Sequence, residues 1–321
     1  MMSEINAQGS ISGNILRLER ASIHDGQGLR TVLFLKGCPL RCPWCSTPES
    51  QLAAAQKGYD LFRCTICGKC IKSCPEGALK ISPGADQVIT NPDKCKLCFA
   101  CAAVCPVTAV KKYGFQLTAA ETLDQICKDE IFYFHSGGGL TISGGEPFMQ
   151  GDFTAAVLRE CKMLGIHTAI ESCMHLPYDH IEKALPWLDH LYVDIKQMDS
   201  RLHQLWIGVD NTMIIENTRK ADSSGYPVGI IVRIPLITGF NDSDQNLVAV
   251  AEFCSTLVNL IKIEILPYHR LGSETYRLLG LDFPCWELDP QSDEDLEERA
   301  SFLKSKAGNI AVITGSGFSA K

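Results

Sequence analysis

One short loop of the sequence holds three cysteines at C-x3-C-x2-C spacing: Cys38, Cys42 and Cys45. Three thiolates on one loop can hold three irons of a [4Fe–4S] cube, which leaves the fourth iron without a protein ligand nearby. An iron with an open position can act on a substrate, as open catalytic metal sites do. A zinc site or unrelated thiols would be the alternative, but zinc sites usually have a fourth Cys or His at matching spacing. We therefore expect the three cysteines to be the catalytic metal ligands.

Eight further cysteines form two runs of the pattern C-x2-C-x2-C-x3-C-P. Each cysteine of the second run lies 31 residues after its counterpart in the first, so the pattern is an internal repeat. It is the pattern of bacterial two-cluster ferredoxins, in which the fourth cysteine of each run binds the other cluster. The expected ligand sets are Cys64, Cys67, Cys70 and Cys105 for one cluster and Cys95, Cys98, Cys101 and Cys74 for the other. We expect the remaining five cysteines to be buried or neutral thiols; they are Cys127, Cys161, Cys173, Cys254 and Cys285.

Bulk composition limits the class of protein. The chain has 321 residues, is 45% hydrophobic and carries a net charge of −7, which suits one large α/β domain plus an insert, or two domains. The mild acidity argues against nucleic acid as a partner. No stretch reaches the roughly 18 apolar residues of a membrane span, and residues 1–13 lack the apolar core of a signal peptide. The clustered cysteines fit a reducing compartment, so we expect a cytoplasmic protein without a membrane partner.

Strands and helices alternate through most of the chain. The patterns predict strands at 14–20, 30–36, 139–143, 167–170, 191–195, 228–234, 261–265 and 310–313. They predict helices at 117–130, 152–164 (capped by Asp152 and ended by Gly165), 178–188, 213–223, 243–257 (capped by Ser243) and 294–305. This order favours βαβ units around a parallel sheet, although periodicity does not separate a closed barrel from an open one. The composition change near residue 57 divides the chain into 1–56, an insert at 57–112, and 113–321.

Unusual polar residues follow the predicted strands, and in parallel sheets and barrels the sites form at these carboxyl ends. The cysteine loop follows the strand that ends near Lys36, and Ser143-Gly144-Gly145-Glu146-Pro147 follows the next. A single such residue is typical of an ordinary solvated loop, whereas six successive strand ends indicate one rim with a site. The other four groups are Glu171 with Ser172, Asp194 with Ile195 and Lys196, Arg233, and Pro267-Tyr268-His269.

The string GLRTVLFLK at 28–36, together with the cysteine loop, resembles the radical S-adenosylmethionine (SAM) superfamily. More narrowly it resembles the activating enzymes of glycyl radical enzymes, of the pyruvate formate-lyase activating enzyme type. The resemblance covers about residues 15–269. It implies a partial (β/α)6 barrel of the TIM type, here with an inserted two-[4Fe–4S] ferredoxin-like domain.

The resemblance also implies the contacts of SAM. The family's Gly-Gly-Glu-Pro motif, at Gly144, Gly145 and Glu146, receives the amino group of the SAM methionine through main chain and carboxylate. In the same family a pair like Glu171 and Ser172, with the later Asp, helps to hold a monovalent cation beside SAM. The remaining implied cofactor-binding residues are Trp44, Cys45 and Ser46 on the adenosyl side, Asp194, Ile195 and Lys196, Arg233, and His269.

Two positions depart from the family pattern. Gln27 stands where the motif Asp-Gly-Pro-Gly has its proline, and Met174 stands where a glycine is common. Both are expected near the groove for the partner's glycyl loop, so they put the partner geometry in question rather than the SAM chemistry. We expect residues 268–277 to form a solvated loop and the acidic run 287–298 to be an exposed helix start.

The activity implied by the resemblance is reductive cleavage of SAM to methionine and a 5′-deoxyadenosyl radical that takes a hydrogen from a backbone glycine of a partner enzyme. It implies three [4Fe–4S] clusters, with flavodoxin or ferredoxin as electron donor. The partner stays open among choline lyase, glycerol or diol dehydratase, hydroxyphenylacetate decarboxylase, benzylsuccinate synthase and isethionate sulfite-lyase systems. Two alternatives are another radical SAM enzyme that modifies a protein or peptide, and an electron-transfer iron–sulfur protein. The insert directly after the cysteine loop favours the activating enzyme over the first.

Overall fold

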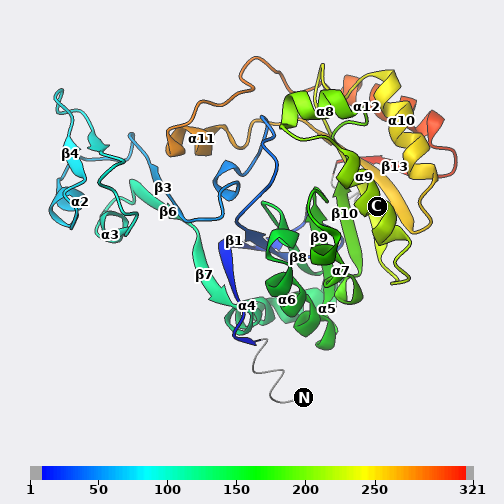
Figure 1. The fold of residues 1–321 in the computed structure, drawn as a ribbon, viewed down its shortest axis with the longest axis horizontal. Coiled ribbons are helices and arrows are strands. Elements are labelled where there is room, and N and C mark those ends of the chain that lie inside the picture. The colour runs from blue at the N-terminus through cyan, green and yellow to red at the C-terminus, as the bar shows by residue number, and fades with distance from the viewer. Residues whose placement is uncertain (1–8, 316–321) are drawn as a thin grey trace.

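The computed structural model describes residues 9–315 and is built on one nine-stranded, mostly parallel sheet (Figure 1). Seven strands run parallel, and β1 pairs antiparallel with both β2 and the edge strand β7. The strand order is β13 (Ala311–Thr314), β12 (Leu260–Pro267), β11 (Gly229–Leu236), β10 (His190–Asp194), β9 (His167–Ser172), β8 (Gly139–Gly144), β2 (Arg30–Leu35), β1 (Ser12–Ser22) and β7 (Phe115–Thr118).

The two faces of this sheet differ in chemistry, because side chains alternate along each strand. One face is apolar and packs under the helices that follow the strands. Its strand residues, including Leu33, Ile142 and Val193, share a core with side chains of α6 (Gly151–Met163), α10 (Asp244–Ser255) and α12 (Asp293–Lys306). The other face is polar: its neighbouring strands carry Thr141, Glu171, Tyr192, Arg233 and Glu264, all aligned by the strand register.

Local sequence signals account for some helix ends. Ser243 caps α10 by accepting a bond from the Asn246 amide, as predicted. The prediction that Asp152 caps α6 is wrong, since that helix begins after Gln150 without a side-chain cap, and Asp152 pairs with Lys183 instead. The other helices that follow the strands are α4 (Ala119–Ile126), α5 (Glu130–Ser136), α7 (Tyr178–Glu182), α8 (Ser200–Ile207), α9 (Thr212–Asp222) and α11 (Ser273–Leu279).

Two predicted segments need correction. The helix predicted over 117–130 starts as the end of β7, because this stretch pairs with β1, and α4 begins only at Ala119. Residues 268–277, predicted as a solvated loop, contain the start of α11, whose Tyr276 is buried against Phe283. Helix α8 was not predicted. The acidic run enters α12 at Asp293, behind a capping box of Ser292 and Asp295.

Residues 56–113, from β3 to β6, leave the sheet and form a small separate part at its β7 side (Figure 1). Its ends run side by side as an antiparallel ribbon of β3 (Gln56–Tyr59) and β6 (Val110–Tyr113). Helix α11 packs on β3, where Arg277 lies 3.5 Å from Asp60. The rest comprises α2 (Lys69–Lys72), a hairpin of β4 (Leu79–Ile81) and β5 (Val88–Thr90), and α3 (Ala100–Ala103).

Across residues 9–315, no helix is both long and apolar enough to cross a membrane.

Candidate functional site

The cysteine loop begins at the carboxyl end of β2 and is held by main-chain bonds from two sides. The amides of Gly37 and Cys38 donate to the carbonyls of Ser50 and Gln51, at 2.6 and 3.1 Å. From the neighbouring strand, the Glu146 amide donates to the carbonyl of Gly37 at 2.7 Å. The first predicted ligand is thus fixed by the turn that follows β8.

That turn requires its glycines. A Cβ on Gly145 would lie 2.1 Å from the Gly37 carbonyl oxygen, and one on Gly144 would lie 2.4 Å from the Leu35 amide nitrogen. Gly144 also has a φ of +108°, which side chains rarely adopt. In this structure the two glycines allow a close approach between the main chain of this turn and that of the cysteine loop.

Glu146 lies inside the protein with its carboxylate fully engaged. It is 0% exposed and accepts bonds from the hydroxyl of Ser172 (2.9 Å), the amide of Cys173 (2.8 Å) and the amide of Phe148 (3.1 Å). Burial raises its pKa, against these donors. Two predicted SAM contacts, Glu146 and Ser172, thus bind each other and join the turns after β8 and β9.

A network of ion pairs joins the predicted residues of three neighbouring strands. Arg233 donates to Glu171 at 2.7 Å and to Asp194 at 3.3 Å, and Lys196 donates to the other oxygen of Asp194 at 3.0 Å. Ser143 donates to Glu171 at 2.6 Å. Glu171 and Asp194 lie at the carboxyl ends of β9 and β10, and Lys196 follows β10. Arg233 lies three residues before the end of β11, which runs beyond the predicted strand to Leu236, and pairs there with Asp194. The network therefore borders the polar face of the sheet.

The charges in this network stabilise one another. Burial alone would raise the pKa of Asp194, but Lys196 and Arg233 outweigh it and hold the pKa below its usual value. The pKa of Lys196 is correspondingly raised: burial is the largest single effect and lowers it, but the attractions of Asp194, Cys42 and Cys173 together outweigh it. Lys196 also acts on the Cys42 thiol, whose pKa burial raises to about 12. The network and the cysteine loop thus meet at one rim.

The other predicted contacts lie around this rim in different environments. Trp44 is buried among Trp206 and Phe240, with ring centroids 6.4 and 5.1 Å away. Ser46 is exposed, and Ile195 belongs to the apolar core. His269 is exposed at the end of β12, where its ring accepts a bond from the Leu271 amide at 3.4 Å. No described contact joins His269 to the ion-pair network.

Three residues of this region were not predicted as part of the site. Cys173 is buried against Cys38 and Glu146, although its spacing gave no signal. Asp25 reaches the polar face near Glu171, and burial followed by that carboxylate raises its pKa. Glu264 is buried beside Lys262, with one carboxylate oxygen unpartnered. These three residues come close to the site through tertiary contacts, which the spacing of residues in the sequence does not reveal.

Both departures from the family pattern have structural explanations. Met174 has a φ of +57°, in the left-handed region that favours glycine, and is 0% exposed in the main core. Met174 is therefore a core residue here, and the expectation that it lies near the groove for the partner stays a prediction. Gln27 lies before β2, in the loop at the opposite end of the strand from the cysteine loop, where its carbonyl accepts a bond from Arg30. This end is not the rim with the cysteines.

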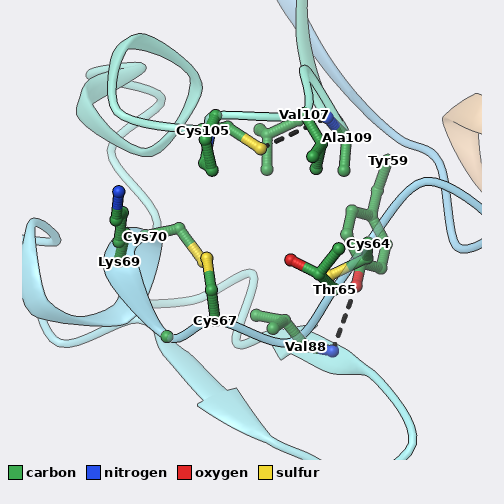
Figure 2. Close-up of a pocket in the computed structure, with 13 residues that line it drawn as sticks. Tyr59, Cys64, Thr65, Cys67, Lys69, Cys70, Val88, Cys105, Val107 and Ala109 are labelled. Carbon is green, nitrogen blue, oxygen red and sulfur yellow. Dashed lines mark hydrogen bonds between the residues drawn. The ribbon is translucent and has the colours of Figure 1, made fainter.

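The eight cysteines of the repeat line two cavities. The first is lined by Cys64, Cys67, Cys70 and Cys105, and Figure 2 shows their side chains around it. The second is lined by Cys95, Cys98, Cys101 and Cys74.

Main-chain amides face the sulfurs of both cavities. Ala78 donates to Cys74 at 3.3 Å and Ala109 to Cys105 at 3.2 Å, two equivalent bonds of the repeat. Burial would raise the pKa of Cys105, but the main-chain donors from Val110, Val107, Ala109 and Thr108 together lower it. Residues 9–315 contain no three His, Cys, Asp or Glu side chains grouped as around a single metal ion. In a four-iron cube each thiolate binds a different iron, so wider spacing is expected.

Comparison with known proteins agrees with this arrangement. Residues 92–251 match the radical SAM superfamily and residues 56–106 match the 4Fe-4S dicluster domain. The isethionate sulfite-lyase activating enzyme of Nitratidesulfovibrio vulgaris is 41% identical over 92% of this chain and 97% of its own. The chain belongs to the glycyl radical enzyme activating enzymes. A further activating enzyme of this kind, for choline trimethylamine-lyase of Oleidesulfovibrio alaskensis, is 36% identical over 93% of this chain and 97% of its own.

An activating enzyme of this family uses iron–sulfur clusters and SAM. It cleaves SAM reductively to methionine and a 5′-deoxyadenosyl radical, which takes a hydrogen atom from a backbone glycine of a glycyl radical enzyme. The fold agrees: Streptococcus suis SuiB, solved with its precursor peptide SuiA, matches with a TM-score of 0.52 at 13% identity, over 86% of this chain and 46% of that chain.

Proposed function

We propose that this activating enzyme binds three [4Fe–4S] clusters through eleven cysteines. Two clusters occupy the insert, one held by Cys64, Cys67, Cys70 and Cys105 and the other by Cys95, Cys98, Cys101 and Cys74. The support is that each cavity is lined by four thiols, three from one run and the fourth from the other. The third cluster binds at Cys38, Cys42 and Cys45. The insert then spans 57–112, between the two parts of the barrel domain at 1–56 and 113–321.

The sheet is proposed to be a partial (β/α)6 barrel whose polar face is the interior. The support is the alternation already described: the apolar face packs under the helices, while the other face carries Thr141, Glu171, Tyr192, Arg233 and Glu264. A polar interior open at the carboxyl ends of the strands is where ligands bind in barrels.

SAM is proposed to bind between the cysteine loop and the ion-pair network. A [4Fe–4S] cluster at this loop supplies an iron that chelates the SAM methionine and the electron that cleaves the S–C5′ bond. Lys196, Asp194 and Arg233 hold a fixed arrangement of charge beside Cys42, which orients the carboxylate and ribose of the ligand. Gly144 and Gly145 place main chain at the same point. Glu146 and Ser172, bound to each other, act by positioning this turn.

A monovalent cation at Glu171, Ser172 and Asp194 would have to share its ligands. Both carboxylates already contact Arg233, so a cation there competes with the guanidinium unless SAM binding moves Arg233 away. Comparing the SAM affinity in potassium and in tetramethylammonium buffers tests this. Equal affinity in both would exclude a role for the cation in SAM binding.

The partner is proposed to be a glycyl radical enzyme that acts on a sulfonate. The support is the gradient of identity among the named relatives. Activating enzymes for isethionate sulfite-lyase and for sulfopropanediol lyase or dehydratase are 39–41% identical to this chain. Those named for choline, hydroxyphenylacetate and indoleacetate enzymes are 32–36% identical.

The observation that carries the proposed site is the direct bond between the Glu146 amide and the Gly37 carbonyl, which joins the glycine turn to the cysteine loop. The test is to mix the anaerobically reconstituted protein, SAM and dithionite with one candidate partner at a time. A glycyl radical doublet in electron spin resonance is expected with an isethionate or sulfopropanediol enzyme. A doublet with the choline enzyme alone would overturn the sulfonate assignment, and no SAM cleavage with any partner would overturn the proposed site.

A further inference from the structure

Charge is distributed unevenly between the insert and the barrel. Residues 57–112 contain nine Lys and Arg against four Asp and Glu, a net side-chain charge of +5. The rest of the chain contains 21 Lys and Arg against 33 Asp and Glu, a net charge of −12. Bound clusters with their thiolates make the interior of the insert more negative, but its surface side chains stay basic. A basic module on an acidic protein indicates a docking surface for an acidic partner.

The cations of the insert are also less neutralised than those of the barrel. On the barrel, several exposed cations have carboxylate partners, such as Arg20 with Asp129 and Lys183 with Asp152. In the described insert, both ion pairs use the same acid, Asp60, which pairs with Arg63 and with Arg277 of α11. The exposed lysines of α2 and of the second cysteine run take part in neither of these two ion pairs, so their charge faces solvent without a carboxylate partner. These lysines are Lys69, Lys72, Lys94 and Lys96.

The internal repeat supplies a comparison within the insert. Helices α2 and α3 occupy equivalent places, each beginning one residue before the third cysteine of its run. At the positions where α2 has Lys69 and Lys72, α3 has Ala100 and Ala103. The fold of the repeat therefore does not need lysine there, since an equivalent helix forms with alanine. Lys69 and Lys72 therefore occur in only one of the two halves of the repeat, and the fold does not require them there.

That half is the outer one. In the β3–β6 ribbon, Lys57 pairs with Lys112 near the barrel, and Tyr59 pairs with Val110 further out. The second cavity is lined by Lys57, whereas the first is lined by Tyr59 and Val110. At about 3.3 Å per residue the difference is roughly 7 Å along the ribbon. The first cavity, with α2, thus lies at the distal end. Cys67 is exposed there, as is the equivalent Cys98 of the inner half, so position along the ribbon and not exposure separates the two cavities.

The inner half instead faces the barrel. A cleft is lined by Cys98 and Phe99 on the insert and by Lys36 and Gly114 at the base of the ribbon. Lys36 comes two residues before the first cysteine of the catalytic loop. The insert therefore presents one cysteine cavity outward and the other toward the catalytic loop.

We propose that the α2 face, defined by Lys69, Lys72 and the exposed Cys67, docks an acidic one-electron carrier protein of the flavodoxin class. The proposal rests on the proposed function, because each SAM cleavage consumes one electron: the carrier is oxidised by one electron, and the S–C5′ bond of SAM takes it up and breaks into methionine and a carbon radical. The carrier must approach an outward-facing cysteine cavity, and its acidic surface complements the lysines there. The acidic barrel repels it elsewhere.

The experiment compares charge-reversed variants of the full-length reconstituted enzyme in binding to a purified flavodoxin. Calorimetry or interferometry at several salt concentrations measures Kd without SAM. Lys69→Glu/Lys72→Glu is expected to weaken binding at least tenfold and to flatten the dependence of log Kd on log salt. Lys72→Glu alone, at a residue that does not line the cavity, is expected to weaken it about threefold.

Two matched controls change the charge by the same amount. Lys94→Glu/Lys96→Glu, on the inner half, and Lys304→Glu/Lys306→Glu, on α12 of the barrel, are each expected to change Kd less than threefold. The proposal is overturned if the α2 variants bind as the wild type does, or if either control loses as much affinity. A plant-type ferredoxin is the second probe; binding of ferredoxin alone would overturn the flavodoxin class.

Iron content and dithionite-driven SAM cleavage are measured in every variant. If Lys69→Glu/Lys72→Glu has lost iron, the single variant Lys72→Glu takes its place in the comparison. Failure of dithionite-driven cleavage in the wild type would overturn the proposed function, while the binding data would still decide the docking surface.

Discussion

The cysteine loop and the two cavities of the insert both present cysteine thiols, but the surrounding main chain holds these thiols in different ways. The loop depends on bonds to distant segments: Gly37 accepts from Glu146, on the turn after β8. In the insert the bonds to sulfur are local, since Cys74 accepts from Ala78 and Cys105 from Ala109. The loop also borders buried, mutually paired charges, whereas the lysines of the insert face solvent. The geometry of the loop is thus a property of the whole barrel, and that of the insert is set locally.

The largest expected effect separates the two kinds of site directly. Cys42→Ser is expected to reduce SAM cleavage to background, because the loop loses one of its three thiolates, while eight irons per chain and ferredoxin-like spectra remain. Iron analysis, optical spectra and chromatographic detection of 5′-deoxyadenosine check this. Simultaneous loss of all clusters would contradict the independence of the insert.

Arg233→Met tests whether the loop depends on the charged network. Removing Arg233 leaves the buried Glu171 without its cation and Asp194 with Lys196 alone, and is expected to cost about 3–5 kcal/mol of the stability of the sheet domain. SAM affinity should fall with it, while the insert keeps its iron. Urea unfolding and a SAM titration measure both. The control Arg299→Met removes an exposed pair and should cost no more than about 1 kcal/mol; equal losses would show that burial of the network is irrelevant.

Gly145→Ala tests the contact between the glycine turn and the loop. Its Cβ would meet the Gly37 carbonyl at 2.1 Å, so we expect about 1–3 kcal/mol of destabilisation and a lower iron content at the catalytic loop alone. In the insert, Gly84→Ala is the matched control, because its Cβ would meet only the Asp86 side chain, at 3.4 Å. If both variants behave alike in unfolding and iron analysis, the turn does not position the loop.

Acid should act on the barrel before the insert. Burial, followed by the nearby Arg30, lowers the pKa of His167 to about 4 from its usual 6.5, and residues 57–112 contain no histidine. Between these values the unfolded chain binds more protons, so stability falls as pH drops from about 6.5 to 4, by about 3 kcal/mol at most. Unfolding free energies from pH 7 to 4 measure this slope. His167→Gln should flatten it; an unchanged slope would assign it to other groups.

The sequence was most informative where chemistry depends on spacing. The cysteines and the polar residues after each strand could be found because ligand spacing and strand ends are local signals. Features set by tertiary contact were missed: Cys173 beside Cys38, the buried Glu264, and helix α8. The predicted direction of Glu146 shows the same limit. Its motif indicated a ligand contact for the carboxylate, but the side chain turns inward to Ser172, which spacing alone does not reveal.

Met174 and Asp152 illustrate two other physical features that a local sequence pattern does not contain. A buried methionine with positive φ is tolerated because its side chain fills the core, a gain that a local pattern does not contain. Asp152 has the residue type of a cap, but the chain enters α6 from a 3₁₀ turn (Pro147–Gln150), so the cap position falls two residues earlier. Local propensity identified the helix and misjudged its first turn.

The ribbon at the base of the insert has an evolutionary and practical consequence. Because Gln56 and Tyr113 are direct cross-strand partners, the chain leaves and rejoins the catalytic domain at almost the same point. An insert whose two ends lie side by side can be gained, lost or exchanged without changing the connections among the surrounding strands and helices. Replacing it by a two-residue hairpin turn should yield a minimal enzyme, and transplanting it should equip a simpler relative with two additional redox centres.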